Sequence, residues 1–376
     1  KPIRESRDID VPLAANHFFY YAGWSDKLAY AFPNRNPVPL GVVGQIIPWN
    51  FLLLMAAWKL GPALAVGCTI VVKPAEQTPL SALRLGELFL EAGFPEGVVN
   101  IVPGYGPTAG GALAGHPDVD KVAFTGSTEV GKLIVNAAVG NLKKVTLELG
   151  GKSPSVVLAD ADLETGIPGV ANAIFFNHGQ CCCAGSRLYV EKNIFDKVVS
   201  GVADQAKQIK MGPGLDPATQ MGPLVSDEQQ HRVLGYLESG FADGAKAVVG
   251  RKRLGDKGYF VEPTVLVNTT STMKVIQEEI FGPVVCAEPF TNVEDVIAKA
   301  NDNIYGLAAA VWTKDLSKGH RLVAQLRAGT VWINCHNIFD ASLPFGGYKQ
   351  SGWGREMGHE ALNLYTEVKS VCAKLA

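Results

Sequence analysis

The sequence has no strong excess of charge and no long apolar run. It contains 34 lysine and arginine residues against 36 aspartate and glutamate residues, for a formal net charge of -2 at pH 7. Because both signs are mixed along the chain, it carries no electrostatic footprint for nucleic acid or for an anionic membrane surface. The longest apolar stretch, 51–58, is too short to cross a bilayer. We therefore expect a small molecule as partner, and neither nucleic acid nor a membrane.

Cysteine is scarce, and its spacing lacks the pattern of a disulfide framework. Seven cysteines, an odd number, are spread over 376 residues. Such usage fits a reducing compartment, so a cytoplasmic protein is expected. Residues 1–10 have neither the apolar core of a signal peptide nor the arginine-rich character of a transit peptide.

The chain is too long for one compact core, so two domains are expected. Short β-branched runs alternate with longer amphipathic stretches, which is typical of parallel strands linked by covering helices. The first group of expected strands is 42–47, 69–72, 98–102, 121–124 and 145–149, with a helix over 79–92. The second group is 155–157, 188–190, 247–249, 264–266 and 330–333, with helices over 162–176 and 194–209. Long loops are expected at 211–223 and 345–354.

Three adjacent thiols, Cys181, Cys182 and Cys183, stand in a glycine-flanked loop after an apolar stretch. Free cysteine often behaves as a small buried hydrophobe, and composition alone does not separate that interpretation from a nucleophile. A thiol with the reference pKa of about 8.5 is only a few per cent thiolate at neutral pH, so a nucleophile needs a base or dipoles nearby. No metal site is predicted, because adjacent cysteines chelate one ion poorly and no CxxC or HxxxH set accompanies them.

Two polar residues follow or end expected strands. Glu148 falls, by alternation, on the face of strand 145–149 opposite the apolar residues, where a solvated position is the ordinary interpretation. Yet Gly150 and Gly151 directly after it would let backbone or a ligand approach closely, at the strand end where open α/β sheets place their sites. Asn50 is either a turn residue or an amide donor for a developing oxyanion.

Two further strand ends offer groups that suit a nucleotide. Gly126 and Ser127 run from a strand into a helix, whose N-terminus offers free N–H groups to a phosphate. The spacing to Gly131 differs from the usual dinucleotide fingerprint, and a plain serine cap fits equally well. Lys73 and Glu76 form either a surface turn or a ribose site, since a carboxylate accepts the two ribose hydroxyls of NAD and repels the phosphate of NADP.

Taken together, these segments resemble the aldehyde dehydrogenase superfamily from about residue 18 to the end. Four stretches carry the resemblance: LELGGKSP at 147–154, FFNHGQCCCAGSR at 175–187, EEIFGPV at 278–284 and PFGGYKQSG at 344–352. The resemblance implies an α/β fold with an open parallel-sheet, Rossmann-like NAD-binding domain and a second α/β catalytic domain. The expected bounds are 1–150 for the first, 151–350 for the second, and 351–376 for a C-terminal helix and oligomerisation strand.

The resemblance also implies a reaction, the NAD-dependent oxidation of an aldehyde to a carboxylic acid. Cys182 is then the nucleophile, and the amide of Asn50 with the backbone N–H of Cys182 holds the oxyanion. Loss of hydride to the nicotinamide leaves a thioester, and Glu148, as a buried base with a raised pKa, activates the water that releases the acid. Lys59 and Glu356 match positions proposed to relay the proton.

For the cofactor, the resemblance assigns the pyrophosphate to Gly126 and Ser127 and the nicotinamide ribose to Glu279. Glu76 argues for NAD over NADP, and Glu148 argues against the CoA-acylating branch. The full expected set is Trp49, Lys73, Glu76, Gly126, Ser127, Gly131, Glu279 and Phe345.

Three features depart from the family pattern. The family's opening segment is missing, which fits a fragment or a divergent form. The stretch 28–39 is shorter than the hairpin by which relatives pair subunits, so 21–40 is expected to form a shortened oligomerisation hairpin in a homodimer or homotetramer. Leu52 follows Phe51 where relatives have proline.

Positions that match the family's substrate tunnel are almost all apolar or aromatic. They are Phe51, Met55, Trp58, Phe176, Cys181, Cys183 and Phe339. Such a tunnel favours a hydrophobic aldehyde such as phenylacetaldehyde. Aromatic walls also hold a quaternary ammonium, and Asn337 and Asp340 lie near the expected tunnel mouth, so betaine aldehyde or an aminoaldehyde is the alternative. A protein that binds NAD without catalysis is a third hypothesis, against which Cys182, Glu148 and Asn50 together argue.

Overall fold

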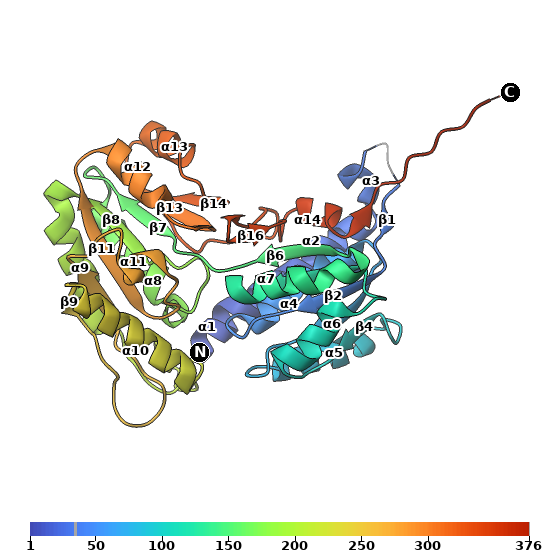
Figure 1. Ribbon diagram of the computed structural model, residues 1–376, viewed down its shortest axis with the longest axis horizontal. Coiled ribbons are helices and arrows are strands. Elements are labelled where there is room, and N and C mark those ends of the chain that lie inside the picture. Colours follow the sequence, from blue (N-terminus) through green and yellow to red (C-terminus); the bar gives the residue numbers. More distant parts are fainter. Residues whose placement is uncertain (34–35, 376) are drawn as a thin grey trace. The chain divides into compact units, whose positions relative to one another are not determined.

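The computed structural model describes residues 1–33 and 36–375, and the chain forms two compact units (Figure 1). The 9–148 unit comprises Ile9–Glu148, Phe339–Gly346 and Gly352–Ala376. The 149–338 unit comprises Lys1–Asp8, Leu149–Ile338 and Gly347–Ser351. Each unit therefore includes short segments from outside its main range, and the domain boundaries expected from the sequence do not include them. Local pairing explains them, since Ile3 N donates to Gly214 O at 2.7 Å and Phe345 pairs its backbone with Glu356.

The 9–148 unit is built on a six-stranded sheet in the order β16-β6-β5-β2-β3-β4. Its strands are β2 Val42–Ile46, β3 Thr69–Lys73, β4 Val99–Ile101, β5 Lys121–Thr125, β6 Lys144–Glu148 and β16 Gly352–Trp353. All neighbours run parallel except β16, which pairs antiparallel with β6. The central strands are buried along their length, as expected for a parallel sheet covered by helices.

Two helices precede the first strand of this sheet, and from β2 to β6 helices and strands alternate. They are α2 Val11–Ser25, α3 Leu28–Ala31, α4 Leu52–Ala65, α5 Leu80–Glu91, α6 Gly111–Gly115, α7 Thr128–Ala138 and α14 Glu360–Asn363. Helix α4 is buried on most of its surface because α2 packs along it. Pro62 lies inside α4, near the C-terminal end of the helix.

The strand order of the 9–148 unit reverses between β2 and β5. The chain runs outward through β2, β3 and β4, and then returns to the other side of β2 for β5 and β6. In open α/β sheets the carboxyl ends of the strands at such a reversal form the ligand site. Here β2 leads into 47–51 and β5 leads into 126–127, so Asn50, Gly126 and Ser127 stand at that position.

The 149–338 unit holds a seven-stranded sheet in the order β14-β13-β7-β8-β11-β10-β9, parallel except for β9. Its strands are β7 Pro154–Val157, β8 Arg187–Glu191, β9 Lys246–Val249, β10 Thr264–Val267, β11 Val284–Phe290, β13 Ala308–Trp312 and β14 Thr330–Ile333. Its helices are α1 Ile3–Glu5, α8 Leu163–Phe175, α9 Phe195–Gln208, α10 Asp227–Ala242, α11 Lys274–Gln277, α12 Val293–Asn301 and α13 Leu316–Val323. Two buried clusters fill its faces, one centred on Val233 and Leu266 and one on Val156 and Val311.

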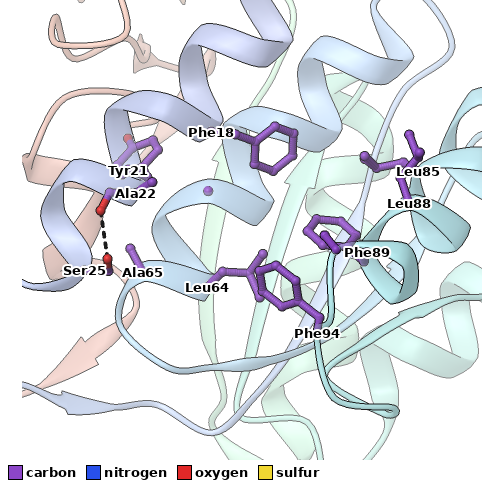
Figure 2. A pocket seen from close by; sticks show the side chains of 12 residues that line it. Phe18, Tyr21, Ala22, Ser25, Leu64, Ala65, Leu85, Leu88, Phe89 and Phe94 are labelled. Atoms are coloured by element: carbon purple, nitrogen blue, oxygen red, sulfur yellow. Dashed lines mark hydrogen bonds between the residues drawn. The ribbon is translucent and has the colours of Figure 1, made fainter.

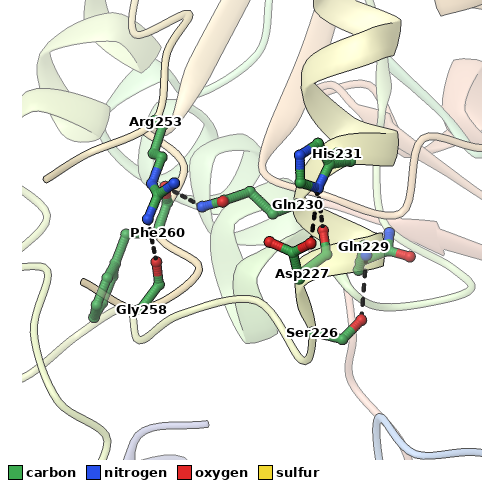
Figure 3. Close-up of polar contacts among 8 residues, drawn as sticks. All are labelled: Ser226, Asp227, Gln229, Gln230, His231, Arg253, Gly258 and Phe260. Atoms are coloured by element: carbon green, nitrogen blue, oxygen red, sulfur yellow. Dashed lines mark hydrogen bonds and ion pairs between the residues drawn. The ribbon is translucent and has the colours of Figure 1, made fainter. Parts of the chain in front are cut away.

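Helix α10 shows how capping fixes an element of this unit (Figure 3). The Ser226 hydroxyl accepts from Gln229 N at 3.2 Å, and Asp227 stands in the first turn, where a negative charge suits the helix dipole. The Gln230 amide donates to Phe260 O at 3.0 Å and ties the helix to the loop before β10. The sequence prediction places no helix here, although serine followed by two acidic residues is a start signal.

The α/β class and the parallel sheets agree with the sequence prediction, and two expectations are wrong in detail. Within the described residues of 21–40 there is no hairpin. The chain forms the end of α2, then α3, and β1 Val38–Pro39, which pairs with β17 Thr366–Glu367. The expected loop 345–354 contains β15 Tyr348–Lys349, paired with β12 Tyr305–Gly306, and β16.

Strands β11 and β13 are absent from the prediction. Strand β13 is rich in alanine, and β11 contains a proline, both residues of low strand propensity. Both strands are buried almost throughout, so neither shows the alternation of a half-exposed strand.

Candidate functional site

The three cysteines lie in a loop that a left-handed turn shapes, between α8 and β8. Asn177, His178 and Gly179 have φ of 48°, 62° and 66°. Asparagine, histidine and glycine are the residues that tolerate this region best. A Cβ at Gly179 would stand 2.0 Å from Gly282 O, so only glycine fits there. Strain of this kind persists only where the surroundings enforce it, and it is common at functional sites.

Hydrogen bonds from neighbouring segments hold that turn. The Asn177 amide donates to Gln180 O at 2.8 Å, and Gly222 N donates to His178 Nε2 at 2.7 Å. Burial lowers the pKa of His178 to about 3, so the ring is neutral and accepts. These positioning residues are not among the expected site residues, although three successive residues that favour positive φ are a visible signal in the sequence.

The central cysteine is the most accessible of the triplet. Cys181 and Cys183 are buried, and their sulfurs lie 3.4 Å apart, whereas Cys182 is half-buried. Hydrogen bonds from the Cys182 and Cys183 thiols lower the pKa of Cys181 well below its ordinary value, and the same proton sharing raises the pKa of Cys182 and Cys183. These pKa directions favour Cys181 as the sulfur that ionises first. Exposure favours Cys182 as the sulfur that meets a substrate.

A turn after β14 fixes Cys183 from a second side. The His336 ring nitrogen Nε2 lies 2.8 Å from Cys183 O, and the Cys183 thiol donates to Asn337 Oδ1 at 3.3 Å. His336 also contacts Trp332, with ring centroids 4.6 Å apart and the rings tilted by 43°. Because a carbonyl only accepts, the imidazole is the donor in the first contact. Asn337, expected near a tunnel mouth, thus contacts the cysteine loop.

Two glycines just before β7 allow Glu279 and the backbone of Cys182 to approach the chain closely at the amino end of that strand. Gly151 N donates to Glu279 Oε1 at 2.9 Å. A Cβ at Gly150 would meet Glu279 Oε2 at 2.3 Å, and one at Gly151 would meet Cys182 O at 2.3 Å. Burial raises the pKa of Glu279 to about 7. The 149–338 unit therefore collects a carboxylate and the cysteine loop at the amino ends of β7, β8 and β11.

Glu148 is buried, which contradicts the solvated strand position that alternation favours. Burial, and then the charge of Glu356, raise the pKa of Glu148 well above its ordinary value, while Lys59 and Arg355 act in the opposite direction. A Cβ at Gly346 would lie 2.9 Å from Glu148 Oε1. A carboxyl group with these surroundings suits proton transfer near neutral pH.

A buried ion pair is close enough to Glu148 to influence it. Lys59 Nζ lies 2.5 Å from Glu356 Oε1, with both side chains almost fully enclosed. Lys121, at the start of β5, is also buried, and donates to Thr146 Oγ1 at 2.9 Å. Burial lowers the pKa of Lys121 to about 7. Lys121 is a residue that the sequence analysis missed, and a lysine opening an otherwise apolar strand is the signal that marks it.

Most of the expected nucleotide residues lie at or just after the carboxyl edge of the 9–148 sheet, whereas Glu279 belongs to the 149–338 unit. Ser127 caps α7, accepting from Val130 N at 3.2 Å, and Gly126 N donates to Glu148 O at 3.1 Å. Lys73 and Glu76 pair at 2.9 Å. Partial burial opposes ionisation of Glu76, but its own backbone N–H and Lys73 outweigh it and lower the pKa of that carboxyl. Trp49 lies in the segment after β2, and Gly131 is buried in α7.

Aromatic rings from two segments meet in the 9–148 unit. Phe51, Met55 and Trp58 are all buried, at a spacing that places them on one side of α4. Trp58 contacts Phe345 and Phe339, with ring centroids 5.4 and 5.8 Å apart, and Phe339 contacts Phe345 at 5.5 Å. Four of the expected substrate residues thus belong to this unit, and Phe176, Cys181 and Cys183 belong to the 149–338 unit.

A hollow elsewhere in the 9–148 unit is lined by none of the expected site residues (Figure 2). It has a volume of about 530 Å³ and lies among α2, α4 and α5, where Phe18, Leu64 and Phe89 form its walls.

In the described part of the chain, no helix has the length and apolar character needed to cross a membrane.

Comparison with known proteins and solved structures shows which family the chain belongs to. Residues 1–371 match the aldehyde dehydrogenase family. A Bacillus subtilis (strain 168) protein, provisionally called aldehyde dehydrogenase DhaS, is 56% identical over 384 residues that cover 100% of this chain and 77% of that protein. The NAD+ complex of aldehyde dehydrogenase from Bacillus cereus is 53% identical with a TM-score of 0.96, covering 99% of this chain and 77% of that one. Betaine aldehyde dehydrogenase from Staphylococcus aureus, also solved with NAD+, is 43% identical with a TM-score of 0.94, covering 98% and 76%.

The chain therefore belongs to the aldehyde dehydrogenase family. It is an enzyme of that class, and its fold is the α/β fold of those solved structures.

Proposed function

We propose that this NAD-dependent aldehyde dehydrogenase oxidises an aromatic or otherwise hydrophobic aldehyde, such as phenylacetaldehyde, to its acid. The observation that carries the proposal is the contact of Trp58 with Phe339 and Phe345, beside the buried Phe51 and Met55. Such walls favour an apolar substrate, at about 0.8 kcal/mol for each buried methylene. An aromatic ring gains a further edge-to-face contribution from them.

The residues at the carboxyl edge of the 9–148 sheet fit NAD. The N-terminus of α7 at Ser127 offers backbone N–H groups to a pyrophosphate, and a Cβ at Gly126 would meet the ring of Phe124 at 2.5 Å. The ionised Glu76 suits the two ribose hydroxyls and disfavours the extra phosphate of NADP. Bound NAD supplies the acceptor for the hydride that the aldehyde loses. We assign cofactor binding to the 9–148 unit and the nucleophile to the 149–338 unit.

The chain's own residues carry the remaining chemistry. The Cys182 thiolate adds to the aldehyde carbonyl, and Asn50 with the Cys182 backbone N–H stabilises the oxyanion. Oxidation of this adduct leaves a thioester on the sulfur. Glu148 then takes a proton from water as the water attacks that thioester, and the acid leaves. The Lys59–Glu356 pair receives the proton onward, a role that its burial beside Glu148 supports.

Betaine aldehyde is the second candidate, because aromatic rings attract a quaternary ammonium and because the chain resembles a betaine aldehyde dehydrogenase. Asp340 would have to assist, but it is exposed and accepts from Ser342 N and Oγ at 2.8 and 2.6 Å. A carboxylate engaged in this way at the surface adds little attraction for a cation. An aminoaldehyde meets the same objection.

The test is NADH formation with phenylacetaldehyde and betaine aldehyde at matched concentrations, with NADP in place of NAD as a further arm. Phenylacetaldehyde should give the higher kcat/KM. Cys182→Ala should abolish activity, whereas Cys372→Ala, which changes an exposed thiol, should not. Activity that survives Cys182→Ala overturns the nucleophile assignment, and a higher kcat/KM for betaine aldehyde overturns the substrate class. Loss of NADH formation in every arm would support a binding protein without catalysis.

Assembly and location complete the proposal. We assign the enzyme to the cytoplasm as a homodimer or homotetramer, since its cysteines are free and the short strands β1 and β17 form a small separate two-stranded sheet. Light scattering of the purified enzyme tests the assembly, and a monomer at micromolar concentration would contradict it.

A further inference from the structure

A buried histidine touches the aromatic group of the 9–148 unit and takes no part in the proposed mechanism. His17 lies on α2 and is 1% exposed. Its ring faces Trp58 with centroids 5.7 Å apart and an interplanar angle of 31°. Trp58 in turn contacts Phe339 and Phe345. His17 thus extends the wall that the proposed function gives to the substrate.

The hydrogen bond of one ring nitrogen fixes what the other nitrogen can do. His17 Nδ1 lies 2.6 Å from Leu13 O. A carbonyl oxygen only accepts, so Nδ1 carries the hydrogen and donates. Burial lowers the pKa of His17, more than the Leu13 contact and the charge of Asp340 raise it. The ring is therefore neutral, and Nε2 presents a lone pair that can only accept.

This acceptor and a neighbouring donor both lack a partner. His17 Nε2 is buried without a hydrogen bond among the described residues, and so is the indole Nε1 of Trp58. A buried polar atom left unpaired costs about 1–3 kcal/mol, so such atoms ordinarily find a partner. A single group that both donates and accepts a hydrogen bond would satisfy the acceptor and the donor on these two adjacent rings. Among the functional groups that fit an aromatic wall, a hydroxyl does both.

We propose that the aldehyde carries a hydroxyl group on its aromatic or hydrophobic part, which donates to His17 Nε2 and accepts from Trp58 Nε1. His17 is then a specificity-determining residue, and hydroxyaryl aldehydes are the preferred substrate class. The inference rests on the proposed function, in that Trp58 and Phe339 line the substrate site. A trimethylammonium group neither donates nor accepts a hydrogen bond, so it satisfies neither ring, which argues against betaine aldehyde.

The first test needs no variant. kcat/KM for NADH formation is measured with phenylacetaldehyde, its 3-hydroxy and 4-hydroxy derivatives, and 4-methylphenylacetaldehyde. The methyl group has nearly the size of a hydroxyl and makes no hydrogen bond. We expect kcat/KM for one hydroxy derivative to exceed that for both phenylacetaldehyde and the methyl derivative by at least about tenfold. A buried hydrogen bond stabilises the bound hydroxy substrate, and a substrate without the hydroxyl leaves two polar atoms unpaired.

Variants then assign the effect to the two rings. His17→Leu and Trp58→Phe each remove one polar atom, and each should reduce the preference for the hydroxy substrate to about twofold or less. The double variant should lower it no further, because one hydroxyl serves both atoms. The matched control is Phe339→Leu, which alters an apolar part of the same wall and should lower kcat/KM for both substrates by a similar factor.

The outcomes separate this inference from the proposed function. No NADH with any of the four aldehydes contradicts the proposed substrate class. Oxidation of all four without preference for either hydroxy derivative contradicts the hydroxyl site alone, and a buried water then satisfies the two rings. A preference that survives both His17→Leu and Trp58→Phe also overturns the inference. The wild-type series decides the question even where a variant fails to fold.

Discussion

The two units carry their expected site residues at opposite edges of their sheets. In the 9–148 unit, Asn50, Ser127 and Glu148 follow or end parallel strands, at the carboxyl edge where the strand order reverses. In the 149–338 unit, the cysteine loop precedes β8 and Glu279 precedes β11, at the amino edge. The general rule for open α/β sheets therefore describes one unit and not the other.

The reason lies in how each edge is built. The 9–148 unit uses helix N-termini, which offer backbone N–H groups without any special sequence. The 149–338 unit instead uses a strained turn, Asn177–Gly179, and the close approach of Gly151 to Cys182 O. The carboxyl edge of the 9–148 sheet, built on helix N-termini, suits a cofactor that many proteins share. The amino edge of the 149–338 sheet, built on strain and close approach, suits the positioning of a single reactive atom. If this division holds, substitutions at the two edges should have different kinds of effect on the reaction.

The largest effect is expected from Glu148→Gln. The amide keeps the size of the carboxyl group but cannot take a proton, so thioester hydrolysis should slow by about 1000-fold, within the usual range for a lost general base. The first turnover, which uses the cysteine, should remain. Stopped-flow measurement should show an NADH burst close to one equivalent followed by a very slow steady state.

The control for this variant is Glu294→Gln, an exposed acidic residue in the first turn of α12 whose loss should leave both phases unchanged. If the burst and the steady state fall together in Glu148→Gln, the residue acts before the thioester, and the separation of roles between the units is wrong. In the wild type, hydrolysis should also accelerate with rising pH through the raised pKa of Glu148, since only the ionised form accepts a proton.

Gly151→Ala tests the other edge. A Cβ there would stand 2.3 Å from Cys182 O, which is backbone and cannot move away cheaply. The cysteine loop must shift, and we expect the NADH burst rate to fall by about 100-fold, since a misplacement of 1 Å costs that much. Gly235→Ala, on α10 with nothing within 4 Å of the added Cβ, is the matched control in the same unit. An unchanged burst rate in Gly151→Ala would show that the close approach does not position the nucleophile.

The sequence reveals the two edges to different extents. The strands of the 9–148 unit are visible in their β-branched runs, and β2, β3 and β5 agree with prediction to within one residue at each end. In the 149–338 unit, β11 and β13 were missed because proline, alanine and burial on both faces hide the alternation. The cysteine triplet and Glu148 stand out as motifs, but the burial of Glu148 reverses what alternation indicates. His17 and His336 acquire roles only through long-range contacts, which no local pattern records.

A smaller effect concerns the buried amine of the 9–148 sheet. The folded pKa of Lys121 is about 7 against an ordinary value of 10.5. Between these pH values the folded chain binds fewer protons than the unfolded chain, so this residue makes the free energy of unfolding rise with pH. The slope is about 1.4 kcal/mol per pH unit. Lys121→Met should remove that slope, as urea unfolding at pH 7, 8 and 9 would show.

Lys132→Met is the control for that measurement, because Lys132 on α7 is exposed. Its slope should match the wild type. Equal slopes for Lys121→Met and the wild type would mean that Lys121 stays protonated in the folded chain, held by the charge of Glu356. The amine would then act as a permanent cation behind the Lys59–Glu356 pair rather than as a titrating group.

The smallest effect is expected at the cofactor edge, with Glu76→Gln. Removing the charge leaves an amide that still binds a ribose hydroxyl, so kcat with NAD should change by less than about threefold. The repulsion of the NADP phosphate disappears, and Lys73, freed from its partner at 2.9 Å, becomes available to that phosphate. The ratio of kcat/KM for NADP to that for NAD should therefore rise by about five- to tenfold. Glu87→Gln, which breaks an exposed pair with Arg84, should leave the ratio unchanged.

Because this edge relies on shared features of helix and strand rather than on strain, its selectivity should change without loss of turnover, which is the opposite of the behaviour expected at Gly151.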